Sequence, residues 1–181
     1  MSTTRIIPLE APYDDAVAET FKRFLPPGME PLALFRTQAH NPRVLQRMFA
    51  GNLLDKGSIE PRVRELVILR TCARCKSEYE WGVHVALFSQ RAALSAADVA
   101  ATLLDEHEHS TLPPPEVLLL KAVDELHDTS TISDALWSEL VQHYRSAQII
   151  EIIALVGSYH SIAFLTNAAR VELEEFAPRF T

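Results

Sequence analysis

The sequence is poor in glycine and cysteine and has no excess of basic residues. Of its 181 residues only five are glycine and two are cysteine, and the formal net charge is −7. A nucleic-acid binder needs a basic surface that displaces counterions from the phosphates, so this acidic chain is not expected to bind nucleic acid. Two cysteines cannot form a disulfide framework, and a structural zinc site needs four ligands.

Long uncharged apolar runs are also missing. The best candidate for a membrane span, residues 149–165, contains Glu151 and His160, whereas a span needs about 20 apolar residues. The N-terminal MSTTR leads into Pro8 and Pro12 and lacks the apolar core of a signal peptide. We therefore expect a cytoplasmic protein with no membrane partner.

Apolar residues make up 48% of the chain and recur at spacings of three and four residues. This composition excludes a disordered chain, and the spacing predicts an all-α helical bundle. We expect one domain over residues 14–181, preceded by an N-terminal tail over 1–13. Helices are predicted at 14–25, 31–38, 42–56, 60–73, 77–93, 95–107, 115–128, 133–145 and 147–170.

The predicted helix over 147–170 is apolar around most of its circumference. A helix that is hydrophobic on all sides must be buried. In a domain of this size, one way to bury it is against another subunit. We therefore expect a homo-oligomer.

Residues 62–84 contain most of the candidate chemistry. Ser77 and Glu80 have the spacing of a capping box, which would start a new helix at this point. Cys75 would then lie just before a helix N-terminus, where the helix dipole favours a thiolate. Cys72 would lie in the last turn of the preceding helix. Cys75 is therefore the better nucleophile, and Cys72 is the supporting or resolving thiol.

Two carboxylates and a histidine lie in the same segment. Glu80 and His84 are four residues apart and share a helix face, so the carboxylate could orient the imidazole as a general acid–base pair. Glu65 lies seven residues before Cys72 and shares its face. Each has a structural alternative: Glu65 as a solvated helix residue, Glu80 as a cap and His84 as a core histidine.

Four further aromatic or histidine side chains are candidates for contacting substrate. Tyr79 and Trp81 lie close to Cys75, although such aromatic residues more often serve in packing than in contacting substrate. Tyr159 and His160 lie on the predicted late helix and could line a pocket.

The remaining histidines give no metal-binding pattern. His40, His127 and His143 look like surface or cap positions, and the run DEHEH at 105–109 looks like a solvated acidic loop. No zinc-ligand spacing, glycine-rich phosphate loop or Ser-His-Asp order is present, so no metal is expected.

The runs RVRELVILR (62–70), Arg74-Cys75 and SEYEWGVH (77–84) resemble the carboxymuconolactone decarboxylase family, which shares its fold with alkylhydroperoxidase D. The resemblance is specific over this segment and looser elsewhere, for example at 157–160. It implies a small all-helical protein without a cofactor that acts on a small-molecule substrate. It also implies a trimer or hexamer with its site near the motif and the subunit contacts.

The family contains two kinds of chemistry, and the sequence lies between them. The decarboxylase-like branch has Cys-x-x-Glu-Tyr-Glu-Trp-x-x-His, which Cys75 to His84 match at every named position. The peroxidase branch has Cys-x-x-Cys-x-x-x-His with a glutamate upstream. Here the position four after Cys75 is Tyr79, and Glu65 lies nearer to Cys72 than that glutamate would. The resemblance implies the decarboxylase-like branch with an additional thiol.

Three functional hypotheses follow. In the first, the protein acts on a small organic acid, lactone or related carbonyl compound; His84, oriented by Glu80, moves protons, while Glu65 and Cys75 line the same pocket. In the second, peroxide oxidises Cys75 to a sulfenic acid, which Cys72 resolves to a disulfide. In the third, the chain is a non-catalytic oligomeric binding protein.

Overall fold

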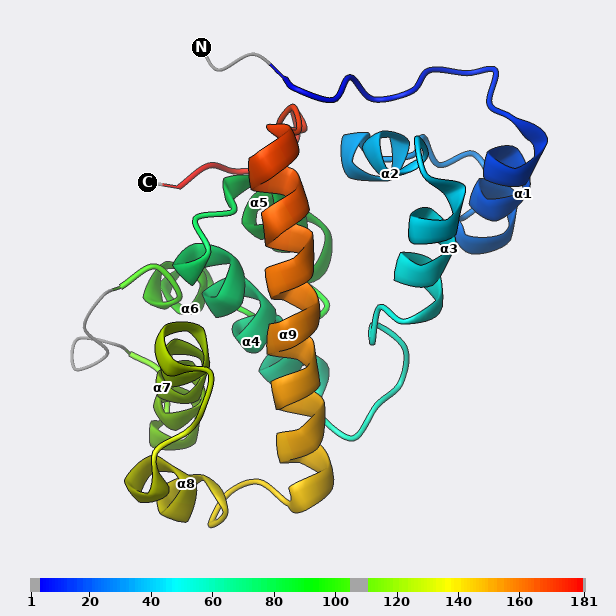
Figure 1. The fold of residues 1–181 in the computed structure, drawn as a ribbon. Coiled ribbons are helices and arrows are strands. Elements are labelled where there is room, and N and C mark those ends of the chain that lie inside the picture. Colours follow the sequence, from blue (N-terminus) through cyan, green and yellow to red (C-terminus); the bar gives the residue numbers. More distant parts are fainter. Residues whose placement is uncertain (1–3, 105–110, 181) are drawn as a thin grey trace.

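The computed structural model describes residues 4–104 and 111–180, and the regular structure in these ranges is entirely α-helical, as predicted (Figure 1). The acidic run at 105–109 lies outside the described residues. The helices are α1 (Asp15–Phe24), α2 (Ala33–Gln38), α3 (Pro42–Ala50), α4 (Pro61–Arg74), α5 (Glu78–Phe88), α6 (Ala96–Ala101), α7 (Pro114–Thr129), α8 (Asp134–Leu140) and α9 (Ser146–Ala169).

Each of these helices begins within two residues of its predicted start, but α3, α5, α6 and α8 end five or six residues early. Helix α3 ends at the C-cap Gly51 and α5 at the C-cap Ser89, and in both cases the chain turns at a left-handed residue further on. Leu53 follows α3 with a φ of 54°, and Ala93 follows α5 with a φ of 52°. A residue in the left-handed region ends a helix or turns the chain beyond it, and hydrophobic spacing does not reveal it.

Helix α4 lies at the centre of the larger bundle and packs against α5, α7 and α9. Its segment from Leu66 to Leu69 is buried on all sides, so the helix has no solvent face over this turn. Polar side chains on α4 that point inward therefore need partners inside the protein.

Arg70 shows how such a group is accommodated. Its side chain is fully buried on α4 and forms a two-pronged pair with Asp124 of α7, with nitrogen–oxygen distances of 2.6 and 2.8 Å. The guanidinium also donates to the carbonyl oxygens of Thr102 and Leu104. This fork ties α4 to α7 and to the segment after α6.

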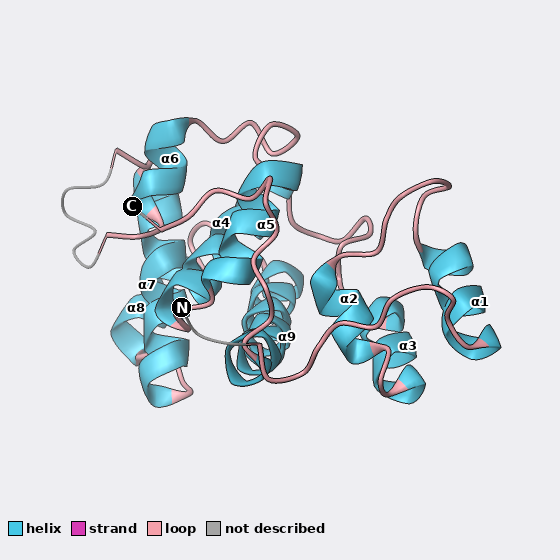
Figure 2. Cartoon of the chain, turned by 90° about the horizontal axis from the view of Figure 1, so that it is seen from above, coloured by secondary structure: helices cyan, strands magenta, loops and turns pink. Residues whose placement is uncertain are grey.

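Helices α1, α2 and α3 form a smaller lobe beside the main bundle (Figure 2). The lobe has its own small core, which includes Val17, Phe21, Ala39 and Leu45. Seen from two directions, it lies on the side of α9 opposite to α7 (Figures 1 and 2). This arrangement leaves a cavity where the lobe meets α5 and α9.

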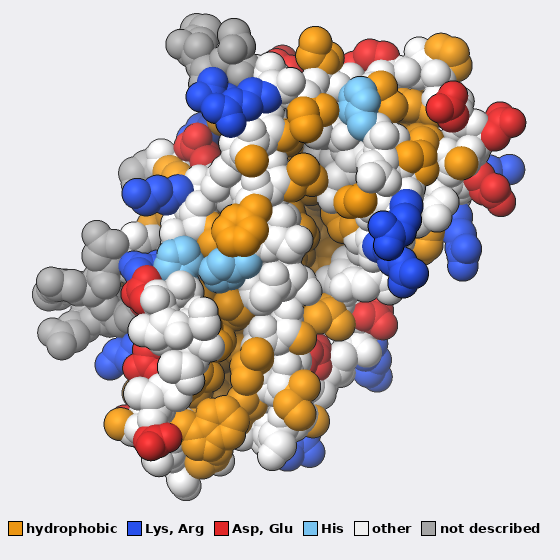
Figure 3. Space-filling view, viewed as in Figure 1, with side chains coloured by type: hydrophobic (Ala, Val, Ile, Leu, Met, Phe, Trp, Pro, Cys, Tyr) orange, Lys and Arg blue, Asp and Glu red, His pale blue; other side chains and the backbone are white. Residues whose placement is uncertain are grey.

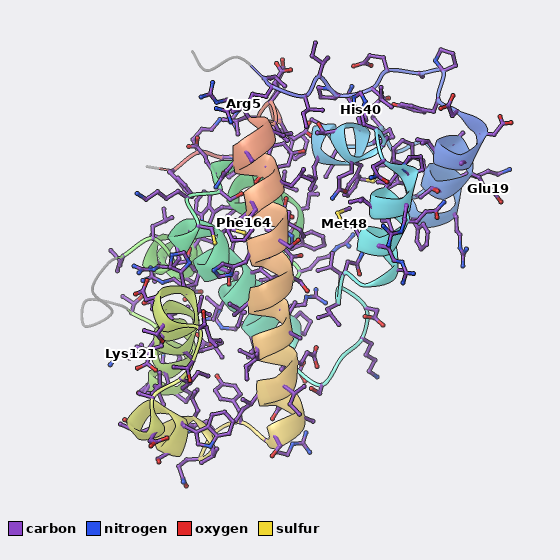
Figure 4. The ribbon with its side chains drawn as sticks, in the orientation of Figure 1. Arg5, Glu19, His40, Met48, Lys121 and Phe164 are labelled. Atoms are coloured by element: carbon purple, nitrogen blue, oxygen red, sulfur yellow. The ribbon has the colours of Figure 1, made fainter. Side chains whose placement is uncertain are left out.

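Helix α9 is long and apolar enough to cross a membrane by length and composition, and so are the core helices of many soluble proteins. Its inner face, which includes Ile152, Leu155 and Tyr159, is buried in the main core. The predicted burial on all sides is not met within one chain, because Ile150 and Phe164 are 68% and 67% exposed. Figure 4 shows Phe164 on the side of α9 that faces the viewer.

Candidate active site

His84 is the centre of a buried hydrogen-bonded cluster formed by α4, α5 and α9. Its Nδ1 lies 2.7 Å from Oε2 of Glu65, and its Nε2 lies 3.0 Å from the hydroxyl oxygen of Tyr159. Oε1 of Glu80 lies 3.5 Å from the same Nε2. All four side chains are buried. The structure therefore brings together three predicted acid–base residues and Tyr159, one of the predicted pocket residues.

The predicted contact between Glu80 and His84 is present, but the shorter carboxylate contact to the imidazole comes from Glu65. Glu65 makes the shorter contact and also accepts a hydrogen bond from Nε of Arg64, at 3.1 Å. The predicted capping box, which assigned Glu80 a second role, is wrong. The hydroxyl of Ser77 pairs with Thr166 of α9 instead of capping α5. Glu80 is thereby left free to face His84.

His84 is held in its protonated form. Burial alone would lower its pKa, but the hydrogen bonds and charges of Glu65 and Glu80 outweigh this effect and raise the pKa to about 9. As an imidazolium, the ring donates from Nδ1 to Glu65 and from Nε2 to the oxygen of Tyr159. The hydroxyl hydrogen of Tyr159 is then available to a ligand. Burial, with the nearby Glu80 and Glu65, keeps the pKa of Tyr159 well above its usual value, so the phenol stays neutral.

A cavity of about 430 Å³ opens onto this cluster, and Glu80, His84 and Tyr159 line it. Met48 of the small lobe lies on the side of α3 that faces α9 (Figure 4). Oε2 of Glu80 is buried and has no hydrogen-bond partner among the described residues, so it can accept one from a ligand. Asn52 and Arg91 are further polar groups in the cavity wall. The rest of the lining is apolar or aromatic and consists of Phe24, Leu25, Pro26, Met29, Leu32, Phe35, Phe49, Leu54, Val83, Leu87, Phe88 and Ile162.

The two cysteines do not line this cavity. Cys72 is fully buried in the main core, and burial together with the charges of Glu80 and Glu65 raises its pKa well above the usual value. Cys75 is the C-cap residue of α4, and its Sγ lies 3.7 Å from Nδ1 of His127. The expectation that Cys75 shares a pocket with His84 is therefore wrong.

The predicted activation of Cys75 is also not met. Its backbone N–H is bonded to the carbonyl oxygen of Thr71, so the residue completes α4 instead of preceding the free N–H groups of α5. Burial raises the pKa of its thiol to about 11, although Arg74 opposes this shift. At neutral pH the thiol is protonated, and a protonated thiol is a weak nucleophile.

The predicted substrate contacts of Tyr79 and Trp81 are replaced by packing. The hydroxyl of Tyr79 donates to Glu174 and accepts from the backbone N–H of Leu34, which anchors the C-terminal segment and α2. The indole N–H of Trp81 donates to the hydroxyl of Thr102 within the core. Neither side chain lines the cavity that contains His84.

The contact of His127 with Cys75 and His160 was missed by sequence reasoning. His127, treated above as a surface or cap position, lies 2.9 Å (Nδ1) from Nε2 of His160 and also contacts Cys75. His160 therefore faces α7 and not the cavity lined by its neighbour Tyr159. No spacing signal could reveal this cluster, because its members lie on three helices that are distant in sequence.

The protonation of His84 predicts a pH-dependent stability. Its pKa is about 9 in the folded protein, compared with 6.5 for an unperturbed histidine, so the stabilisation is fully present below pH 6.5 and is lost as the pH rises through 9. The shift corresponds to about 3 kcal/mol of unfolding free energy. Urea unfolding at several pH values checks this, and the His84→Gln variant, which keeps both thiols, should lose that part of the pH dependence. An equal pH dependence in both proteins would contradict the assignment.

Solved structures that are similar to this chain share an all-helical fold of the alkylhydroperoxidase D (AhpD) type. An AhpD-core, peroxidase-related protein from Ralstonia eutropha JMP134 superposes with a TM-score of 0.80 at 18% identity, covering 97% of this chain and 94% of that one. A peroxidase-related protein from Silicibacter sp. TM1040 gives 0.78 at 18% identity, with 97% and 95% covered. A variant of the debrominase Bmp8, in complex with 2,3,4-tribromopyrrole, gives 0.72 at 18% identity, with 96% and 94% covered.

The sequence comparison finds a family match over part of the chain. Residues 42–111, which include α4 and α5, match the model of the carboxymuconolactone decarboxylase family. No curated protein matches the sequence significantly. The chain therefore has an AhpD-like fold, and its segment 42–111 is similar to the carboxymuconolactone decarboxylase family.

Proposed function

We propose that this protein is an acid–base enzyme that acts on a small, largely apolar carbonyl acid or lactone. The observation that carries the proposal is the buried Glu65–His84–Tyr159 chain, which ends at an apolar cavity. A family-level enzymatic role is consistent with the family match and with neighbours named as peroxidase-related proteins and a debrominase.

The chain of hydrogen bonds supports proton delivery to carbon. In a decarboxylation beta to a carbonyl, the bond to the carboxylate breaks, carbon dioxide leaves, and its electron pair passes into the carbonyl to form an enolate. The hydroxyl of Tyr159 can stabilise this enolate and give its proton to the carbon while it takes one from the His84 imidazolium. Reprotonation of the imidazole from water restores the starting state.

The lining of the cavity supports a flat, apolar substrate that carries an anionic or carbonyl group. Its walls suit a flat apolar body, and Oε2 of Glu80, which has no hydrogen-bond partner among the described residues, suits a hydrogen-bond donor on the ligand. Arg91 and Asn52 can meet an anionic or carbonyl group. The tribromopyrrole bound by the debrominase is likewise a small flat ring, which supports a ligand of this shape.

Carbon dioxide release tests the proposal. Wild-type protein is incubated with a panel of small aromatic β-keto acids and carboxylated unsaturated lactones, and release is compared with that in buffer. We expect acceleration of at least one compound in the panel, with the His84→Gln variant close to the buffer rate. If no member reacts faster than in buffer and none binds to the cavity, the proposal is wrong.

A thiol peroxidase is the second candidate, because the chain has the Cys72-x-x-Cys75 spacing and two similar structures are named as peroxidase-related proteins. It requires a disulfide between Cys72 and Cys75 after peroxide treatment. Because burial protonates both thiols and neither lines the cavity, we expect stoichiometric peroxide to leave the mass of the intact protein unchanged. A two-dalton loss, reversed by dithiothreitol, would favour the peroxidase instead.

We also propose that α9 forms a contact between copies of this chain. Hydrophobic side chains are exposed along it, and Ile150, Ile153 and Phe164 are the largest (Figure 3). Phe164→Glu should shift the protein from a trimer or hexamer toward a monomer in sedimentation equilibrium. Phe176→Glu, at a similarly exposed phenylalanine outside α9, is the matched control and should not. A monomeric wild type would contradict this proposal.

A further inference from the structure

A second cluster of chemically active side chains lies on the α7 side of α9, while the cavity lies on the side of α1–α3 (Figure 1). It consists of Cys75 at the end of α4, His127 on α7 and His160 on α9. The thiol sulfur and one ring nitrogen of each histidine all lie within 4.8 Å of one another. Histidine side chains gather at the surface over this part of α9 (Figure 3).

The orientation of His160 is fixed by its backbone contact. Its Nδ1 lies 2.8 Å from the carbonyl oxygen of Val156, one turn earlier on α9. A carbonyl only accepts, so Nδ1 carries the proton and Nε2 presents its lone pair to the cluster. A histidine that binds a metal typically donates its other N–H to a carbonyl or carboxylate in this way.

His127 is arranged in a similar manner. Its Nδ1 faces both Sγ of Cys75 and Nε2 of His160, at 3.7 and 2.9 Å. Its other nitrogen, Nε2, lies 4.0 Å from a carboxylate oxygen of Asp128, which also pairs with Arg74. If an ion takes the lone pair of Nδ1, the ring proton moves to Nε2 and points toward that carboxylate.

Two of the three ligand–ligand distances are close to those of a tetrahedral ion, and the third, from Cys75 to His160, is within 4.8 Å. Zinc bonds of about 2.3 Å to sulfur and about 2.1 Å to nitrogen require a sulfur–nitrogen separation near 3.6 Å and a nitrogen–nitrogen separation near 3.4 Å. The observed sulfur–nitrogen distance of 3.7 Å already fits. The observed nitrogen–nitrogen distance of 2.9 Å requires the two rings to separate by about 0.5 Å. This is a small rotation for side chains that are only half-buried.

We propose that Cys75, His127 and His160 form a Zn²⁺ site that joins α4, α7 and α9, with a fourth position open to water. One sulfur and two imidazole ligands are a typical zinc donor set, and three protein ligands leave one position free. On binding, the thiol of Cys75 gives up its proton and becomes a thiolate ligand. This site is separate from the His84 cluster, so it does not depend on the proposed function.

Cobalt substitution tests the site directly. Apoprotein prepared with a chelator is titrated with Co²⁺, and we expect one equivalent to bind with a thiolate-to-cobalt charge-transfer band in the near ultraviolet. Zn²⁺ should displace the cobalt. At a hundredfold excess of free Zn²⁺ over its Kd, the Tm should rise by roughly 5–10 °C.

Variants identify the ligands. Cys75→Ser should abolish the charge-transfer band, and His160→Gln should weaken Co²⁺ binding at least tenfold. His143→Gln, at an exposed histidine outside the cluster, should bind as the wild type does. In the wild type, one equivalent of Zn²⁺ should also slow alkylation of Cys75 by iodoacetamide at least tenfold, a readout that needs no variant. Co²⁺ binding without the band, or alkylation unaffected by Zn²⁺, would overturn the proposal.

Discussion

Replacing His84 with glutamine should lower turnover of the decarboxylation substrate by roughly 10²–10⁴. Glutamine keeps hydrogen-bonding groups in the place of the imidazole, but it cannot hold a transferable proton between Glu65 and Tyr159. The loss should appear in kcat, since the side chain is one of many groups that line the cavity. His143→Gln is the matched control, because it removes an exposed histidine.

Tyr159→Phe separates proton relay from packing. The phenylalanine keeps the ring that packs edge-on against His84, at a centroid distance of 5.1 Å, but removes the hydroxyl that faces the cavity. If the relay is correct, this variant loses turnover in the same way as His84→Gln. Full turnover in either variant would show that the relay does not carry the reaction.

Replacing Glu65 with glutamine should destabilise the folded protein by about 3–5 kcal/mol at pH 7, because it leaves a buried imidazolium without its closest counter-charge. Part of this cost is avoided if His84 loses its proton, so the pKa of His84 should fall in the variant. Chemical denaturation measures the first effect, and the pH dependence of unfolding measures the second.

Glu80→Gln is the matched control for Glu65→Gln, because both carboxylates contact His84 and lie on helices in the same core. The contact from Glu80 is longer, 3.5 Å against 2.7 Å, and one of its oxygens has no partner among the described residues. Glu80→Gln should therefore cost less stability than Glu65→Gln. Equal losses would mean that the two carboxylates share the charge of His84 evenly.

Hydrophobic spacing was sufficient to predict the helices, because apolar residues recur three and four positions apart over long stretches and strand-like alternation is nearly absent. It could not predict where α3 and α5 end. Helix α3 ends at the C-cap Gly51 and α5 at the C-cap Ser89, and the left-handed residues that turn the chain beyond them, Leu53 and Ala93, are neither glycine nor asparagine. The exposed part of α9 in a single chain is compatible with the predicted burial against another subunit, since apolar composition alone does not say whether one chain or several cover a helix.

The candidate site was predictable in its members but not in its pairing. Glu80 and His84 share a helix, so their spacing suggested a pair, yet the shorter contact comes from Glu65 on another helix. Helix packing sets that contact, and local sequence does not encode it. Helix packing also places Cys75 away from the cavity and next to His127. No rule of sequence spacing predicts the contact between Cys75 and His127.

Nuclear magnetic resonance of ¹⁵N-labelled histidine, titrated from pH 6 to 10, tests the central claim most directly. The account predicts that both ring nitrogens of His84 are protonated at pH 7 and that the ring loses a proton near pH 9, with the signal assigned by its absence in His84→Gln. In Glu65→Gln the same transition should move to lower pH. A His84 ring that is neutral at pH 7 in the wild type would contradict the account.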